Sequence, residues 1–140
     1  DGKKLAYISD RTGRPQGYIM DLSTKKVSRL SKKGSYNTSP SWSPDSSMVA
    51  FTSSRKGSRT AIYRARINNS LASERQVSPK GMAAESPTWS PDGSMVAFQG
   101  WHRGDWKIFY VLSSGSSAER LTNSKQGIVE TGPTWSSKLR

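Results

Sequence analysis

The sequence predicts an all-β fold, a β-propeller built from four-stranded antiparallel blades. One short motif occurs three times, as Pro40-Ser-Trp-Ser-Pro-Asp45, Pro87-Thr-Trp-Ser-Pro-Asp92 and Pro133-Thr-Trp-Ser136. The copies are 47 and 46 residues apart, and a fixed period of this length indicates an array of one supersecondary unit. Short apolar runs bounded by turn residues follow the copies, as expected of β-strands. Four short strands in about 45 residues are typical of a propeller blade.

Each period is expected to hold four strands in the same order. The strand that carries the motif tryptophan comes first. The second is expected at residues 4–8, 47–51 and 94–98, the third at 17–20, 61–64 and 107–110, and a weaker fourth at 28–30, 76–78 and 120–122. These runs are rich in Val, Ile, Met and aromatic residues, which favour strands. No window of useful length has the periodicity of a helix.

The strands divide the chain into about three blades. Blade one is expected over residues 1–39 without its tryptophan strand, blade two over 40–86 and blade three over 87–132. Residues 133–136 are expected to form one further, closing strand. The opening Asp1-Gly2 matches the end of another motif copy, so the chain is expected to begin and end within the motif.

A tight turn is expected after each complete motif. In Ser90-Pro-Asp-Gly93, proline fixes φ at the first central position and glycine accepts a positive φ without steric cost. Ser46 stands where Gly93 does, so the earlier turn is expected to be more strained. Asp45 and Asp92 occupy the same position in the two turns, where an Asp side chain accepts hydrogen bonds from nearby backbone N–H groups. A structural role is therefore expected for both carboxylates.

The chain is strongly basic, with a formal net charge of +12. Residues 1–66 hold 14 Lys or Arg against 4 acidic residues, whereas residues 67–140 hold 8 against 6. Such charge is compatible with an ordinary solvated surface or with attraction to an acidic partner, nucleic acid or anionic lipid. The cations cluster in predicted hairpins and are not interleaved with aromatic residues, which is a weak nucleic-acid signature. No apolar stretch approaches the ~20 residues of a membrane span.

Catalytic constellations are missing from the sequence. There is no cysteine, and His102 is the single histidine, so a two-histidine metal site is excluded; His102 is expected to be a surface loop residue. No G-x-S-x-G elbow occurs, and residues 112–117 are expected to form a Gly/Ser turn. The sequence therefore predicts a protein that is not an enzyme and has no cofactor or metal.

The five tryptophans fall into two groups. Trp42, Trp89 and Trp135 recur at a fixed phase, which indicates packing between blades, where a large ring buries much area. Trp101 and Trp106 flank a hairpin, Trp101-His-Arg-Gly-Asp-Trp106, that is found in one repeat only. This aromatic pair is a candidate for contact with a partner.

The repeat resembles the propeller repeat of the TolB family. The resemblance rests on Pro87-Thr-Trp-Ser-Pro-Asp-Gly-Ser-Met-Val-Ala-Phe98 and on Asp10-Arg-Thr-Gly-Arg-Pro-Gln-Gly-Tyr-Ile-Met-Asp21. It covers essentially the whole chain. Gly17 departs from the pattern, because an aliphatic residue is usual there. Peptidases of the prolyl-oligopeptidase and tricorn type carry similar blades, so a propeller fragment of a serine peptidase is the alternative.

The resemblance implies a non-catalytic, periplasmic subunit of the Tol–Pal cell-envelope system with a six-bladed propeller, of which the three blades here would be half. In that family the propeller binds the peptidoglycan-associated lipoprotein Pal, chiefly through loops at the mouth of the central channel. The loops just before each Pro-x-Trp are expected to line this mouth and to bind the partner. Their residues are Tyr36, Asn37, Thr38, Ser39, Ala84, Glu85, Ser86, Glu130, Thr131 and Gly132. A nucleic-acid-binding surface on the basic first half is a further alternative; nucleic acid is not the expected partner.

A half propeller is also expected to self-associate. Rings of four to eight blades close, whereas three blades leave open edges and an exposed apolar face. The closing strand at residues 133–136 has the form of the strand that blade one lacks. Two chains are therefore expected to exchange these strands head to tail and to form a six-bladed homodimeric ring.

Overall fold

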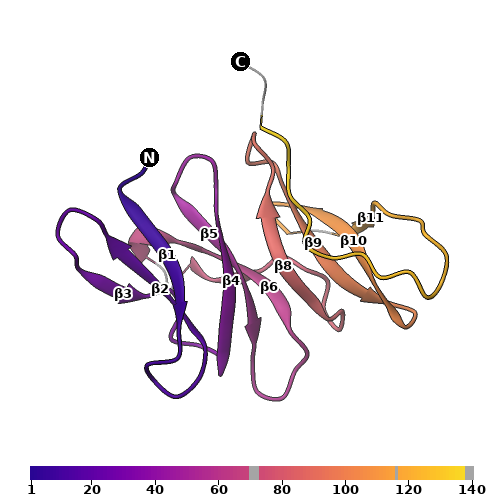
Figure 1. The fold of residues 1–140 in the computed structure, drawn as a ribbon, viewed down its shortest axis with the longest axis horizontal. Coiled ribbons are helices and arrows are strands. Elements are labelled where there is room, and N and C mark those ends of the chain that lie inside the picture. The colour runs from indigo at the N-terminus through magenta and orange to yellow at the C-terminus, as the bar shows by residue number, and fades with distance from the viewer. Residues whose placement is uncertain (70–72, 116, 138–140) are drawn as a thin grey trace.

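The computed structural model describes residues 1–69, 73–115 and 117–137. Three antiparallel sheets lie side by side like the leaves of a fan (Figure 1). The first sheet contains β1 (Lys4–Ser9), β2 (Gln16–Asp21) and β3 (Val27–Arg29). The second contains β4 (Tyr36–Trp42), β5 (Met48–Ser54), β6 (Ala61–Arg66) and β7 (Arg75–Gln76), with the 3-10 turn η1 (Ile67–Asn69) after β6. The third contains β8 (Ala84–Trp89), β9 (Met95–His102), β10 (Asp105–Leu112) and β11 (Glu119–Arg120).

The predicted all-β fold class is confirmed, and the strand order within each sheet follows the chain order. Two differences concern the motif strands. β4 begins at Tyr36 and β8 at Ala84, so the expected blade boundaries at 39/40 and 86/87 fall inside strands. Residues 133–136 form no strand, because a strand needs a hydrogen-bonded neighbour and this segment has no ladder partner in the structure.

The core consists of two apolar layers, each between neighbouring sheets. β5 contributes to both, since successive side chains of a strand point to opposite faces. Val49 and Phe51 pack toward the first sheet with Ile19 and Leu30, whereas Ala50 packs toward the third sheet. The second layer consists of Ala50, Ile62, Val77, Ala84, Trp89, Val96, Phe98, Phe109 and Val111. The middle sheet is thus covered on both faces, which explains the nearly continuous burial along β5.

Gly17 departs from the expected repeat because a neighbouring side chain fills its space. Leu30 is fully buried, and a Cβ atom added to Gly17 would lie 2.9 Å from Leu30 Cδ2 and 3.2 Å from Leu30 Cβ. These separations are shorter than ordinary carbon contacts. An aliphatic side chain at position 17 is therefore excluded while Leu30 keeps this place in the core.

Candidate functional site

The antiparallel order brings one set of connections to the same end of all three sheets. This end, which we call the rim, carries residues 10–15, 30–35, 55–60, 77–83 and 103–104. It lies at the bottom of Figure 1, whereas the turns after the Trp-Ser-Pro motifs lie at the opposite end. β4 and β8 begin at the rim. The residues expected to bind a partner are thus brought to one end of the molecule.

The expectation that residues 36–39 and 84–86 form loops is wrong. They are the first halves of β4 and β8, where Asn37 pairs with Ser53 and Glu85 with Gln99. Their polar composition hid the strand, because the pairing depends on backbone groups and not on an apolar pattern. The third set, Glu130 to Gly132, lies outside any strand, as expected.

A bulge separates the two halves of each motif strand. The register shifts between Thr38 and Ser41 in β4 and at the same phase in β8. Proline has no N–H to donate to the ladder, so the pairing is interrupted there. The residue before each motif proline has a positive φ: 51° at Ser39, 55° at Ser86 and 63° at Gly132. The three copies therefore share one backbone bend at the rim.

Backbone hydrogen bonds fix each copy against the preceding sheet. The donor is the backbone N–H of the residue two positions before the bend. The acceptor is a carbonyl oxygen of the preceding sheet, near the start of β2, β6 or β10. The three bonds run from Asn37 to Pro15 at 3.1 Å, from Ala84 to Thr60 at 3.0 Å and from Glu130 to Trp106 at 3.0 Å. In two of the three copies, a side chain also accepts a hydrogen bond from the backbone N–H at the bend. Ser86 N donates to Thr52 Oγ1 at 3.1 Å, and Gly132 N to Gln99 Oε1 at 3.2 Å. The rim is thus presented by a fixed backbone.

Exposure divides the ten expected contact residues. Asn37, Thr38 and Ala84 are buried and serve the fold, since a buried side chain cannot reach a partner. Tyr36, Thr131 and Gly132 are exposed, and Ser39, Glu85, Ser86 and Glu130 are half-buried. The carboxylate of Glu85 accepts a hydrogen bond from Thr60 Oγ1 at 3.1 Å. The surface available to a partner is therefore smaller than the sequence predicted.

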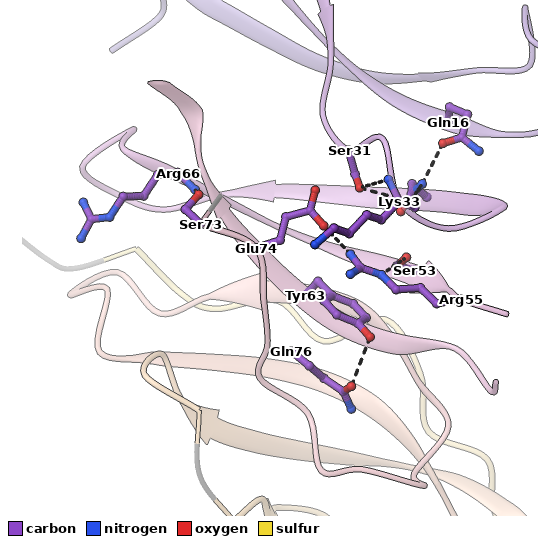
Figure 2. Close-up of polar contacts among 11 residues, drawn as sticks. Gln16, Ser31, Lys33, Ser53, Arg55, Tyr63, Arg66, Ser73, Glu74 and Gln76 are labelled. Carbon is purple, nitrogen blue, oxygen red and sulfur yellow. Dashed lines mark hydrogen bonds and ion pairs between the residues drawn. The ribbon is translucent and has the colours of Figure 1, made fainter. Parts of the chain in front are cut away.

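Asn37 organises a buried polar cluster next to the rim. Its Nδ2 donates to Gln16 Oε1 at 2.7 Å and to the carbonyl oxygen of Lys33 at 2.9 Å. Arg29 donates to the same Gln16 oxygen at 2.8 Å, and Gln16 Nε2 donates to the carbonyl of Ser35 at 3.1 Å. Figure 2 shows the side chains of Gln16 and Lys33 near the loop before β4. The cluster fixes residues 33–35.

Sequence reasoning missed a second cluster, centred on Arg55. Its Nη2 lies 2.5 Å from Glu74 Oε2, and its guanidinium carbon lies 3.6 Å from the centroid of the Tyr63 ring (Figure 2). Arg55 Nε also donates to Ser53 Oγ at 3.3 Å. The Glu74 side chain is fully buried. No local signal links residues 19 positions apart, so only the fold reveals this pair.

The Trp101–Trp106 hairpin forms as expected. The two residues oppose each other in the β9–β10 ladder, their rings meet edge to face with centroids 5.4 Å apart, and Trp101 is 41% exposed. His102 differs from the expectation of a surface loop. It is the last residue of β9 and half-buried, with its ring 6.0 Å from that of Phe109. The ladder extends to His102 because Arg103-Gly104, both with positive φ, close the hairpin in two residues.

The expected structural role of the two motif aspartates is confirmed. Asp45 Oδ1 accepts from Ser43 Oγ at 2.6 Å and from Ser47 N at 3.1 Å. Asp92 repeats this with Ser90 and Ser94 at 2.6 and 3.0 Å. These hydrogen bonds stabilise the ionised carboxylates and lower the pKa of each from 3.8 to about 2. The carboxylates close two separate turns and do not form a catalytic pair.

The described residues contain no group of three or more His, Cys, Asp or Glu side chains placed to hold a metal ion. Within the same residues, no helix is long and apolar enough to cross a membrane.

The sequence matches one protein family along nearly its whole length. The TolB beta propeller domain family matches residues 1–139. The chain is also 43% identical over 58 residues to the Tol-Pal system protein TolB of Alcanivorax borkumensis, an alignment that covers 41% of this chain and 13% of that protein.

Solved structures of TolB proteins resemble this chain in fold. A putative TolB from Agrobacterium tumefaciens has a TM-score of 0.79 and 25% identity over 89% of this chain and 44% of its own. TolB from Acinetobacter baumannii has a TM-score of 0.70 and 29% identity over 82% of this chain and 28% of its own. A puromycin-hydrolyzing peptidase of Mycobacterium tuberculosis has a TM-score of 0.71 and 20% identity over 89% of this chain and 21% of its own. This similarity shows a shared fold alone. The chain spans less than half the length of each.

Proposed function

Because this chain belongs to the TolB β-propeller family, we propose that it is a non-catalytic protein-binding module whose rim binds a Pal-type peptidoglycan-associated lipoprotein. The proposed setting is the periplasm, where the complex would help to maintain the cell envelope. One observation carries the proposal: three equivalent bends, at Ser39, Ser86 and Gly132, are held at one end of the sheets by repeated hydrogen bonds. A rigid scaffold that presents short exposed segments is typical of recognition surfaces.

The exposed members of the rim supply the contacts in this proposal. Tyr36 is 39% exposed and offers a large amphipathic ring, the kind of side chain enriched at binding hot spots. Thr131 and Gly132, in the third copy of the motif, are also exposed, and Glu85, in the second copy, offers a half-buried carboxylate. The buried Asn37 and Ala84 hold the strands and do not touch the partner.

Calorimetric titration with the soluble domain of a Pal-type lipoprotein tests the proposal. We expect saturable binding, and we expect Tyr36→Ala to weaken it at least about tenfold, as truncation of an aromatic hot spot does. Leu22→Ala is the matched control, because Leu22 is 38% exposed against 39% for Tyr36 and lies in the turn after β2, at the opposite end. No binding at high micromolar concentration, or equal weakening by both variants, contradicts the proposal.

We also propose that the 140-residue chain, prepared by itself, completes a propeller ring by pairing with a second copy. β1 is an edge strand, whereas its counterparts β5 and β9 are each paired on both sides. Leu5 and Ile8 of β1 are 50% and 46% exposed. Residues 133–136 of a second copy, which lack a ladder partner, would supply the strand that covers them. Six blades would then close, within the range that forms rings.

A further inference from the structure

A basic cavity lies at the rim between the first two sheets. It has a volume of about 700 Å³ and is lined by Arg14, Lys33, Gly34, Ser35, Arg55, Lys56 and Gly57. These residues come from three separate connections: the β1–β2 turn, the loop before β4 and the β5–β6 turn. Four of the seven are cationic and none is acidic. The fold therefore gathers positive charge that the sequence distributes over more than 40 positions.

Three of the four cations are free to bind a ligand. Arg14, Lys33 and Lys56 are exposed, and within the described residues the single ion pair is that between Arg55 and Glu74. No side-chain hydrogen bond engages the charged groups of these three residues in that part of the chain. Like charges around one cavity repel each other, so an incoming anion would relieve the repulsion.

The cavity wall is held in place before any ligand arrives. Arg55 is fixed by Glu74, Ser53 and the Tyr63 ring, as described above (Figure 2). Gly34 has a φ of 81°, and a Cβ there would lie 2.8 Å from both Ser53 Oγ and the carbonyl oxygen of Ser54. Glycine thus allows the loop that carries Lys33 to lie directly against the end of β5.

A second cavity at the rim, lined by the β5–β6 turn, β6, β7 and the loop before β8, provides an internal comparison. It measures about 650 Å³ and is lined by two cations, Arg59 and Lys80. Backbone register makes Arg59 the counterpart of Arg14, and the shared Lys-Gly sequence makes Lys80 the counterpart of Lys33. The two cavities are similar in size, and the first is lined by four cations where the second is lined by two.

We propose that the cavity between the first two sheets binds a carboxylate-bearing segment of a partner protein, with Arg14, Lys33 and Lys56 as its contacts. A compact cavity ringed by cations suits one or two neighbouring Asp or Glu side chains. A nucleic acid strand needs a longer row of cations and aromatic platforms for its bases, whereas none of the seven residues that line this cavity is aromatic. This site lies next to the proposed Pal contact at Tyr36, since Ser35 lines it, but the proposal requires neither Pal nor ring closure.

Fluorescence anisotropy with a fluorescein-labelled hexaglutamate peptide tests the proposal, and a hexaglutamine peptide serves as the uncharged probe. We expect hexaglutamate to bind and hexaglutamine not to bind. Arg14→Gln/Lys33→Gln should weaken hexaglutamate binding about tenfold or more, because charge-assisted hydrogen bonds are the strong ones. The matched control is Arg59→Gln/Lys80→Gln, which removes the same charge from the equivalent positions and should change the affinity less than about threefold. All four substitutions are at exposed positions and leave the core unchanged, and thermal melts verify that the variants fold.

Three results would overturn the proposal. Equal weakening by the two double variants would show that hexaglutamate responds only to the net charge. Displacement of the peptide by a few millimolar inorganic phosphate would show that the cavity takes a small free anion. Tighter binding of a twelve-nucleotide oligothymidylate, lost in Arg14→Gln/Lys33→Gln, would assign the cavity to nucleic acid.

Discussion

The indole Nε1 of Trp89 donates a hydrogen bond of 3.1 Å to the carbonyl oxygen of Ser41, the residue before the preceding motif tryptophan. Trp135 repeats the contact with the carbonyl oxygen of Thr88, again at 3.1 Å. These two tryptophans thus join their own segments to the preceding motif strand through the indole N–H group. The two copies of the contact are one repeat apart, so the same residue type at the same phase makes the same contact in successive repeats.

Replacing Trp89 by phenylalanine should destabilise the protein by about 2 kcal/mol, because it leaves the Ser41 carbonyl without its donor and reduces a buried ring. Trp89 is 6% exposed. Urea denaturation followed by circular dichroism measures the loss. Trp101→Phe is the control, because Trp101 is 41% exposed and should change stability by less than about 0.5 kcal/mol. Similar losses for both variants would contradict a special role for the Trp89 contact.

The stability of the motif turns should depend on pH in the acid range. Asp45 and Asp92 have folded-state pKa values lowered from 3.8 to about 2. A lowered folded-state pKa stabilises the protein above the unfolded value, and this contribution is lost as the pH falls from about 4 to about 2. We therefore expect the urea midpoint to be flat near neutrality and to fall below pH 4.

The variant Asp45→Asn/Asp92→Asn should be less stable than the parent at pH 7, and the difference should shrink toward pH 2. Asp10→Asn is the control, because Asp10 is exposed and its carboxylate accepts no hydrogen bond in the described structure. Parallel pH profiles for the parent and the double variant would show that the two turn carboxylates do not cause the acid sensitivity.

The turn at Ser46 is strained, as the sequence predicts. Ser46 has a φ of 59°, against 75° for Gly93 at the same position of the next repeat. We expect Ser46→Gly to be neutral or to stabilise by up to about 1 kcal/mol, because relief of the left-handed conformation outweighs the added freedom of the unfolded chain. Gly93→Ala should destabilise by about 1 kcal/mol, although a Cβ at this position meets Pro44 only at an ordinary 3.6 Å. Thermal midpoints measure both, and changes of the same sign would contradict the strain argument.

Lys107 holds the segment after β11 against the third sheet. It is 3% exposed, and its ammonium donates to Ser124 Oγ at 2.7 Å and to the carbonyl oxygens of Lys125 and Ile128 at 3.2 and 2.5 Å. Lys107→Met should cost about 2 kcal/mol, because these acceptors lose their charged donor. Cleavage by a protease should also become faster at residues 121–130. Lys125→Met, at an exposed position, is the control and should leave both measurements unchanged.

The second and third strands of each period were predictable from sequence because their apolar runs reflect burial on one or both faces. β10 alternates between buried and half-buried residues, and β5 is nearly continuous. The starts of β4 and β8 were not predictable in this way. Their residues are polar or small, and hydrogen bonds to the preceding sheet position them. The Arg55–Glu74 pair and the basic cavity likewise arise from connections far apart in the chain, which a local pattern does not bring together.

Light scattering on the purified 140-residue chain tests the proposed exchange of motif segments. We expect a mass close to twice that of one chain, with dissociation on dilution, because a second copy would cover the half-exposed Leu5 and Ile8 and pair with the edge of β1. Deleting residues 133–140 should yield a monomer. Leu5→Asp should also weaken the dimer, since it places a charge in the new interface, whereas Leu22→Asp, a comparable change in the turn after β2, should not. A folded monomer at all concentrations would refute the exchange, and a dimer that survives the deletion would assign self-association to a different surface.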